Sequence, residues 1–226
     1  MPTARRPKRS LSDEMYDELL SQFMDGSRIP GEALNIDALS RELSVSPTPL
    51  REALAKLEAT GLVRREALKG YRVAPALEAK EVEKLLDARI TLEPALAFET
   101  ARRTTPEFLE ELEASVIELE RSVELADEDA NAFQLYWASD GRFHSLIAEQ
   151  CSNPFLEVTY RSLLGHIQRF RLFSKIGSAS GARFAAIEHR LILEALAAGR
   201  PADAADLMRD HLEKAKQRAV ALASVN

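Results

Sequence analysis

The 226-residue chain lacks several features that mark common protein classes. Its single cysteine, Cys151, excludes an internal disulfide and a thiolate zinc cluster, and it fits a reducing compartment. No stretch approaches the roughly 18 uncharged apolar residues that a membrane helix needs, and no apolar run follows the basic N-terminus. We therefore expect neither membrane insertion nor secretion. With 46% hydrophobic and 29% charged residues, the composition is that of a globular protein, and the single cysteine leads us to expect a cytoplasmic one.

Motifs of common enzymes are missing as well. The chain has no glycine-rich nucleotide loop, no Gly-x-Ser-x-Gly and no His-Glu-x-x-His. None of the four histidines has a glutamate three residues before it, which argues against the Glu-x-x-His pairs of di-iron bundles. Cys151 follows His144 by seven residues, about two helical turns, with no oxyanion feature nearby. We expect a protein that is not an enzyme.

The net charge of −6 is unevenly distributed along the chain. Residues 1–75 hold 12 Lys or Arg against 11 Asp or Glu, whereas residues 76–226 hold 18 against 25. Residues 1–9 form a basic tail, which we expect to be flexible and either solvated or laid along a nucleic-acid backbone. The first part can therefore present a local basic surface although the whole chain is acidic.

Residues 10–75 carry the pattern of a winged helix-turn-helix. Ser10 is a good N-cap for a first helix that ends before Gly26, and Ser46 followed by Pro47 begins the third helix. The complete expected order is a helix from Leu11, a helix over 35–43, a helix over 47–60, and a hairpin of strands 62–65 and 69–73. A third helix of this length fits the major groove of DNA, and the hairpin can touch the backbone.

Residues 76–79 are the expected linker to an all-helical domain over residues 80–222. β-branched runs vanish there in favour of Ala, Leu, Glu and Arg. Pro94 lies inside a continuing apolar pattern and predicts a kink, and the segment 177–181, rich in Gly and Ser, predicts a flexible connection. The expected helices cover 78–103, 106–125, 131–150, 154–173, 183–198 and 201–223. The predicted fold class is thus mainly α, with a small β-hairpin wing.

Four polar residues of the helical part form a candidate metal site. Asp140 and His144 are four residues apart on one expected helix and share a face, while His189 and His211 lie on the last two helices. Three imidazoles and one carboxylate suit zinc, nickel, manganese or iron. The alternative is that each histidine packs separately in a helical core, because residues far apart in sequence often never meet.

Arg89 and His166 are further candidates for the same domain. Arg89 precedes Glu93 by four residues, so it either anchors a carboxylate or phosphate of a ligand or forms an internal salt bridge with Glu93. His166 has no clear partner, and we regard it as a residue that packs or lines a pocket.

Two sets of residues resemble a known family. Val45-Ser-Pro-Thr-Pro-Leu-Arg-Glu-Ala-Leu54, Gly61-Leu62-Val63 and Gly70-Tyr71-Arg72-Val73 are similar to the DNA-binding domain of GntR-family transcription regulators. Residues 80–222 resemble the helical ligand-binding domain, called FCD, of the family's FadR-like branch, through Asp140-x-x-x-His144, Asn153, Glu188-His189 and His211-Leu212. The resemblance implies that Asp140, His144, His189 and His211 hold a divalent metal and that Arg89 contacts an acidic effector.

The DNA-contacting residues are expected at the start of the third helix and at the wing. Many family members hold arginines at the position of Pro47 and near Asp37, and this chain has neither. Ser46, Thr48 and Arg51 remain on the helix, and Gly70 lies at the wing tip; these residues can contact phosphates, and Arg51 can also bind guanine. The alternative for Arg51 is an exposed charge paired with Glu52 or Glu58.

Together these observations predict a transcription regulator, and we expect a repressor. It would bind a near-palindromic double-stranded operator as a homodimer, and a small carboxylate effector would bind at a divalent metal ion, with zinc as the first expectation. Two alternatives remain open: a metal-dependent enzyme fused to a DNA-binding module, and a bundle that only dimerises.

Overall fold

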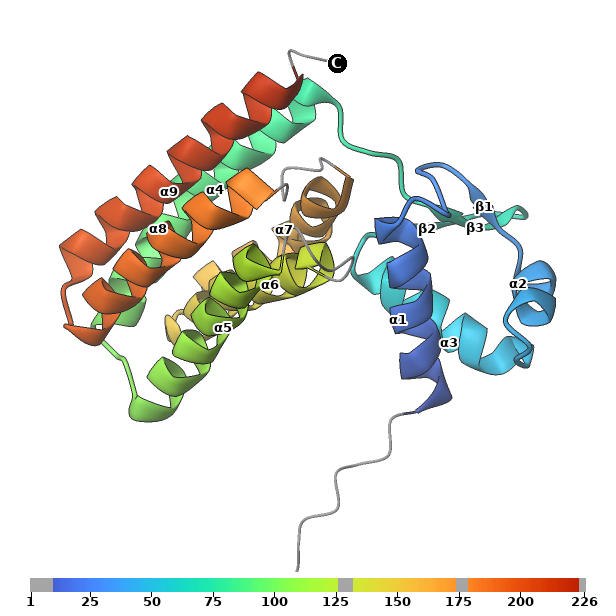
Figure 1. The fold of residues 1–226 in the computed structure, drawn as a ribbon, viewed down its shortest axis with the longest axis horizontal. Helices are drawn as coiled ribbons and strands as arrows, with labels where there is room; N and C mark the ends of the chain where they lie inside the picture. Colours follow the sequence, from blue (N-terminus) through green and yellow to red (C-terminus); the bar gives the residue numbers. More distant parts are fainter. Residues whose placement is uncertain (1–9, 126–131, 174–178, 224–226) are drawn as a thin grey trace, which may run out of the picture. The chain divides into compact units, whose positions relative to one another are not determined.

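The computed structural model describes residues 10–125, 132–173 and 179–223. The chain divides between Pro75 and Ala76 into two compact units, which are described separately. The basic tail over residues 1–9 lies outside the described residues. Figure 1 shows that the first unit combines helices with a small sheet, whereas the second is built of helices.

Three helices form most of the first unit. α1 spans Leu11–Met24, α2 spans Ile36–Glu42 and α3 spans Pro47–Ala59. The predicted cap at α1 is present, since Ser10 and Asp13 form a capping box, and Ser46 is the N-cap residue of α3 but makes no side-chain capping bond. The Asn35 side chain caps α2, which was not predicted. α1 packs on α3 through buried leucines and a phenylalanine, among them Leu19, Leu20, Phe23, Leu50, Leu54 and Leu57. Local capping and one apolar stripe on each helix therefore explain this part of the fold.

The wing is a three-stranded antiparallel sheet. β1 covers Ala33–Leu34, β2 covers Val63–Glu66 and β3 covers Gly70–Val73, in the order β1-β3-β2. The predicted hairpin of β2 and β3 is confirmed, with Glu66 opposite Gly70 next to the turn. β1 was not predicted, because two residues are too few to show a period of two; only pairing with β3 makes them a strand.

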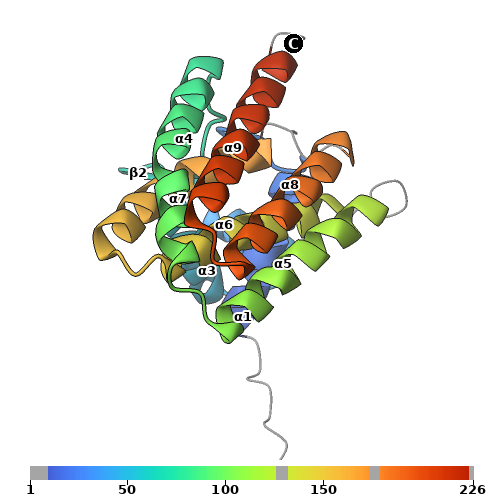
Figure 2. The same ribbon diagram turned by 90° about the vertical axis from the view of Figure 1, so that its left-hand side faces the viewer.

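In the second unit, the described residues form six helices. α4 and α9 lie side by side in both views, and α5 packs against α6 and α8 (Figures 1 and 2). Pro106, Pro154 and Pro201 each begin a helix, as predicted. α4 continues through Pro94. The bounds are Ala79–Ala101 for α4, Pro106–Glu124 for α5, Ala132–Gln150 for α6, Pro154–Phe173 for α7, Ala179–Ala197 for α8 and Pro201–Ala223 for α9.

The expected connection over 177–181 is wrong at its C-terminal end. Residues 179–181 belong to α8, which begins four residues before the predicted start at Arg183, while residues 177 and 178 lie outside the described part. Gly181 and Ala182 are buried, so tertiary packing outweighs the poor helix propensity of glycine here. The early start matters for the site described below, because Gly181 lines its cavity.

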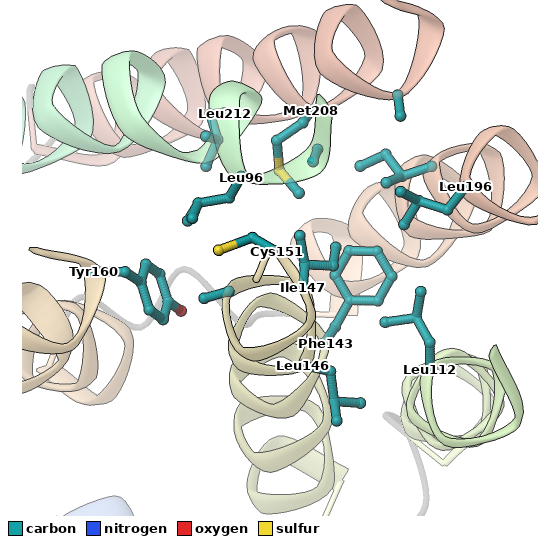
Figure 3. Close-up of a cluster of buried hydrophobic side chains, with 14 of the residues drawn as sticks. Leu96, Leu112, Phe143, Leu146, Ile147, Cys151, Tyr160, Leu196, Met208 and Leu212 are labelled. Atoms are coloured by element: carbon teal, nitrogen blue, oxygen red, sulfur yellow. The ribbon is translucent and has the colours of Figure 1, made fainter. Parts of the chain in front are cut away.

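The apolar core of the second unit takes side chains from all of its helices. Figure 3 shows Phe143, Leu146 and Ile147 of α6 beside Leu112 of α5 and Leu196 of α8, with Leu212 and Met208 of α9 opposite. Cys151 is buried in this cluster as a free thiol. This shared core holds α6, α8 and α9 in place, and these are the helices that carry the candidate metal ligands. Within the described residues, no helix has the length and apolar character to cross a membrane.

Candidate metal centre and nucleic-acid interface

The four predicted metal ligands come together in the second unit. Asp140 and His144 lie on α6, His189 on α8 and His211 on α9, and all four are buried. One ligand atom from each residue lies within 4.8 Å of the others. The alternative in which each histidine packs separately in the core is therefore wrong for these three.

Asp140 links the cluster to an arginine. Its Oδ2 forms an ion pair with Nε of Arg171 at 2.6 Å, while Oδ1 lies 3.5 Å from Nε2 of His189 and 3.9 Å from Nε2 of His144. Burial alone would raise the pKa of Asp140, but Arg171 and the neighbouring histidines outweigh it and hold the pKa well below its usual range. The carboxylate is thus ionised, with one oxygen free to face a cation.

His144 presents Nε2 to the cluster, while its other nitrogen lies beside a carboxylate. Nδ1 lies 2.6 Å from Oε2 of Glu93, and Glu93 is also bound by Arg89, with 2.5 Å between Oε1 and Nε. Burial lowers the pKa of His144 to about 4, although the Glu93 carboxylate opposes the change. The ring is therefore neutral at pH 7. A proton on Nδ1, beside the carboxylate, leaves the lone pair of Nε2 available. Neither ring nitrogen makes a hydrogen bond of good geometry with a described residue, so the contact of Nδ1 with Glu93 is a close ion-pair distance.

His211 repeats this arrangement on the other side of the cluster. Its Nδ1 lies 2.7 Å from Oε2 of Glu188, and both oxygens of Glu188 accept hydrogen bonds from Arg218 at 3.1 Å. Nε2 of His211 lies 3.4 Å from Nε2 of His189. Each outer carboxylate thus orients one imidazole toward the same point, as carboxylates do behind histidine ligands in metal sites.

His189 is held by stacking. Its ring lies 3.9 Å from the ring of Phe143 at an angle of 11°. Burial lowers the pKa of His189 well below its ordinary value, so this imidazole is neutral as well. Three imidazoles and one ionised carboxylate, all buried and convergent, fit a divalent metal ion by the chemistry of their donor atoms.

A small cavity adjoins the cluster. Its volume is about 30 Å³, enough for about two water molecules. Arg89, Arg171 and Arg218 line it together with Asp140, His144 and His211. Of the two alternatives for Arg89, the salt bridge with Glu93 is present, and the contact with an acidic effector stays a prediction. His166 is exposed and does not line this cavity.

Sequence reasoning missed Arg171 as a residue of the site. A signal was available, because Arg171 follows Ile167 by four residues and Tyr160 by eleven, on the stripe that α7 buries. A charged residue at such a position indicates a buried partner.

The predicted DNA contacts are all exposed in the first unit. Ser46, Thr48 and Arg51 lie at the start of α3, and Gly70 begins β3 with a φ of 83° that favours glycine. Ser46 is the N-cap residue of α3, but its side chain makes no capping hydrogen bond, so the hydroxyl stays available.

Arg51 and the wing share one surface groove. It has a volume of about 270 Å³ and is lined by Arg51 and Asp37 together with Lys69, Gly70 and Tyr71. Arg51 forms no ion pair with any described residue, so the expected alternative pairing with Glu52 or Glu58 is absent in the part of the chain that the structure describes. Lys69, which is not among the predicted contacts, is likewise unpaired within those residues.

The winged helix-turn-helix with its exposed third helix defines the class: a DNA-binding transcription regulator. Residues 11–73 match the model of bacterial regulatory proteins of the gntR family, and residues 84–214 match that of the FCD domain. The chain belongs to the gntR family of bacterial regulatory proteins and carries an FCD domain.

Relatives agree with this assignment. The chain is 29% identical over 184 residues to the uncharacterized HTH-type transcriptional regulator YdhC of Bacillus subtilis, covering 80% of this chain and 78% of YdhC. It is 28% identical over 200 residues to the HTH-type transcriptional repressor GlaR of Escherichia coli, covering 87% of this chain and 90% of GlaR. Among solved structures, E. coli McbR/YncC shares the fold with a TM-score of 0.70 and 18% identity, covering 97% of this chain and all of the other.

Proposed function

We propose that this regulator is a metal-containing repressor whose affinity for operator DNA is controlled by a small carboxylate. The observation that carries the proposal is the buried convergence of four ligand atoms, one each from Asp140, His144, His189 and His211, beside a cavity lined by arginines. Buried polar groups are costly unless they have a partner, so a bound cation explains why these four ligand atoms are gathered.

Oδ1 of Asp140 and the Nε2 atoms of the three histidines would hold the metal. A divalent ion, with zinc as the first expectation and nickel, manganese or iron as alternatives, supplies a Lewis-acid centre that takes oxygen ligands. Glu93 and Glu188 orient His144 and His211 through Nδ1. Both carboxylates are also engaged by arginines, which argues against a free general base and hence against the metal-dependent enzyme.

Control of DNA binding would follow if the metal and effector stabilise one arrangement of the helices and operator DNA stabilises another. The ligands come from three helices, α6, α8 and α9, so a bound ion and effector favour the arrangement in which these helices converge. Ser46, Thr48, Arg51 and Gly70 would contact the operator. Effector and operator then weaken each other reciprocally, since both bias one equilibrium. GlaR, a relative, is named a repressor, which supports that sign of regulation.

A homodimer is part of the proposal. α8 exposes Phe184, Ile187 and Leu191 in a row at 54%, 57% and 44% of their surface. Apolar residues exposed together on one helix indicate a protein contact, and a two-fold dimer matches a near-palindromic operator. Light scattering of the purified protein measures the expected mass of two chains.

The test begins with metal analysis of untagged protein purified without chelator. Wild type should contain about one divalent ion per chain, His144→Ala should lose it, and the exposed His166→Ala should keep it as the matched control. Binding to DNA from the region upstream of its own gene is then measured by anisotropy with metal-loaded protein, with and without candidate carboxylates. Protein that stays free of metal after reconstitution would refute the metal site, and turnover of a carboxylate would favour the enzyme instead.

A further inference from the structure

The three arginines of the cavity differ in how their guanidinium groups are used. Arg89 binds Glu93 through both Nε and Nη2, at 2.5 Å and 3.3 Å. Arg218 binds Glu188 through Nη1 and Nη2. Arg171 binds Asp140 through Nε alone. Two of the three guanidinium groups thus bind a carboxylate through two nitrogens, whereas Nε is the nitrogen of Arg171 that pairs with Asp140.

Nη2 of Arg171 is a buried donor without an acceptor. Arg171 is 6% exposed, and Nη2 has no hydrogen-bond partner among the described residues. A buried guanidinium N–H left unsatisfied is costly, and native proteins usually supply an acceptor from the chain, a water or a ligand. Because Arg171 lines the cavity, an acceptor placed there would satisfy this donor.

Once a divalent ion is bound, the net charge around the cavity is positive and favours binding of an anion. Glu93 neutralises Arg89, Glu188 neutralises Arg218, and Asp140 neutralises Arg171. A divalent ion held by Asp140 and three neutral imidazoles would leave its charge uncompensated in a buried site. A second carboxylate in the cavity balances half of it.

The backbone of α6 leaves room for Arg171 at this position. A Cβ atom added to Gly141, the residue after Asp140, would lie 3.3 Å from Nη1 of Arg171, which is a tight contact. Gly181 and Ala185 of α8 and Ala215 of α9 also line the cavity with small or no side chains. These small residues therefore leave space for a ligand beside the guanidinium of Arg171.

We infer that Arg171 is the residue that selects a carboxylate ligand. One oxygen of the ligand accepts from Nη2 of Arg171, and the other faces the four ligand atoms, so the ligand repeats the bridge that Asp140 already makes between Arg171 and the cluster. The inference rests on the proposed function and deepens it. The cavity of about 30 Å³ restricts the ligand to a small carboxylate.

Acetate and its neutral isostere acetamide test this inference on the full-length, zinc-loaded protein. Calorimetry measures their binding, and elemental analysis measures zinc in every sample. Wild type should bind acetate and not acetamide. Arg171→Lys, which keeps the charge and loses the fork, should keep its zinc and bind acetate at least about tenfold more weakly. Arg190→Lys, a change at a surface ion pair on α8, should behave as wild type.

The outcomes separate the inference from the proposed function. Wild-type protein that holds no zinc contradicts the proposed function itself. Zinc-loaded wild type that ignores acetate, or that binds acetamide equally well, overturns the inference and leaves the metal site standing. Equal acetate affinity in Arg171→Lys and wild type would also overturn the inference. If Arg171→Lys loses zinc, Gly141→Ala decides: it crowds Nη1 without removing any donor, and unchanged acetate affinity with zinc retained would overturn the inference.

Discussion

The two units use their charged residues in opposite ways. In the first unit, Arg51 and Lys69 are exposed and unpaired within the described residues, at a groove between α3 and the wing. In the second unit, Arg89, Arg171 and Arg218 line a buried cavity, and each has a carboxylate partner. Exposed cations cost little and can neutralise any phosphate, whereas buried ones are kept only where partners hold them in one geometry. The first arrangement suits a long polyanion, and the second suits a small ligand of defined shape.

The largest effect, on operator affinity in the first unit, is expected from Arg51→Gln. Removing an unpaired cation at the start of α3 should lower operator affinity by about 1–3 kcal/mol, roughly 5- to 150-fold, and should leave the metal content unchanged. Fluorescence anisotropy at a fixed salt concentration measures the affinity. Arg190→Gln in the second unit is the control and should bind DNA as wild type does. A metal content altered by Arg51→Gln would contradict the separation of the two units.

An intermediate effect, on metal affinity in the second unit, is expected from Glu188→Gln. Losing the carboxylate behind Nδ1 of His211 should weaken metal binding about 10- to 100-fold, because the imidazole is then less basic and less well oriented. Competition with a chromophoric chelator measures this affinity. Glu194→Gln, an exposed glutamate on the same helix, is the matched control. Equal metal affinity in the two variants would show that Glu188 serves Arg218 only.

The smallest effect concerns an ion pair at the surface of the first unit. The hydrogen bond from Lys56, at 2.5 Å, and those from Ser10 lower the pKa of Asp13 from 3.8 to about 2. A carboxylate whose pKa is lower in the folded state stabilises the fold above pH 3.8, and this stabilisation is lost as the pH falls toward 2. Asp13→Asn should therefore be slightly less stable at pH 7 and lose less stability over that acid range.

Chemical denaturation at pH 7, 4 and 2.5 measures this difference. Glu14→Gln, an exposed neighbour on α1, is the control and should follow wild type. Parallel pH profiles for Asp13→Asn and wild type would mean that the pair with Lys56 contributes nothing measurable, as is common for surface ion pairs.

Much of the first unit could be predicted because its determinants are local. Ser10 caps α1 and Asn35 caps α2 through backbone donors no more than three residues away, and Pro47 begins α3. The places of Ser46, Thr48 and Arg51 at the exposed start of this helix follow from local signals, whereas their contact with DNA was inferred mainly from the family resemblance. β1 could not be predicted, since its two residues become a strand only by pairing with β3 some forty positions later.

The candidate metal centre was predictable in its members and not in its geometry. The spacing of Asp140 and His144 places them on one helical face, but nothing in the sequence states that α8 and α9 bring His189 and His211 within reach. The family resemblance supplied that step. Arg171 was missed because its partner, Asp140, lies 31 positions away on another helix.

The sequence by itself determined where helices begin, which faces they bury and which polar residues were available, because caps, prolines and apolar periods act within a few residues. Only the tertiary structure decided that Gly181 is helical, that Glu93 and Glu188 stand behind two histidines, and that Arg171 keeps a donor free beside the cluster. These features depend on how six helices pack around one core, and packing is a property of all the contacts together.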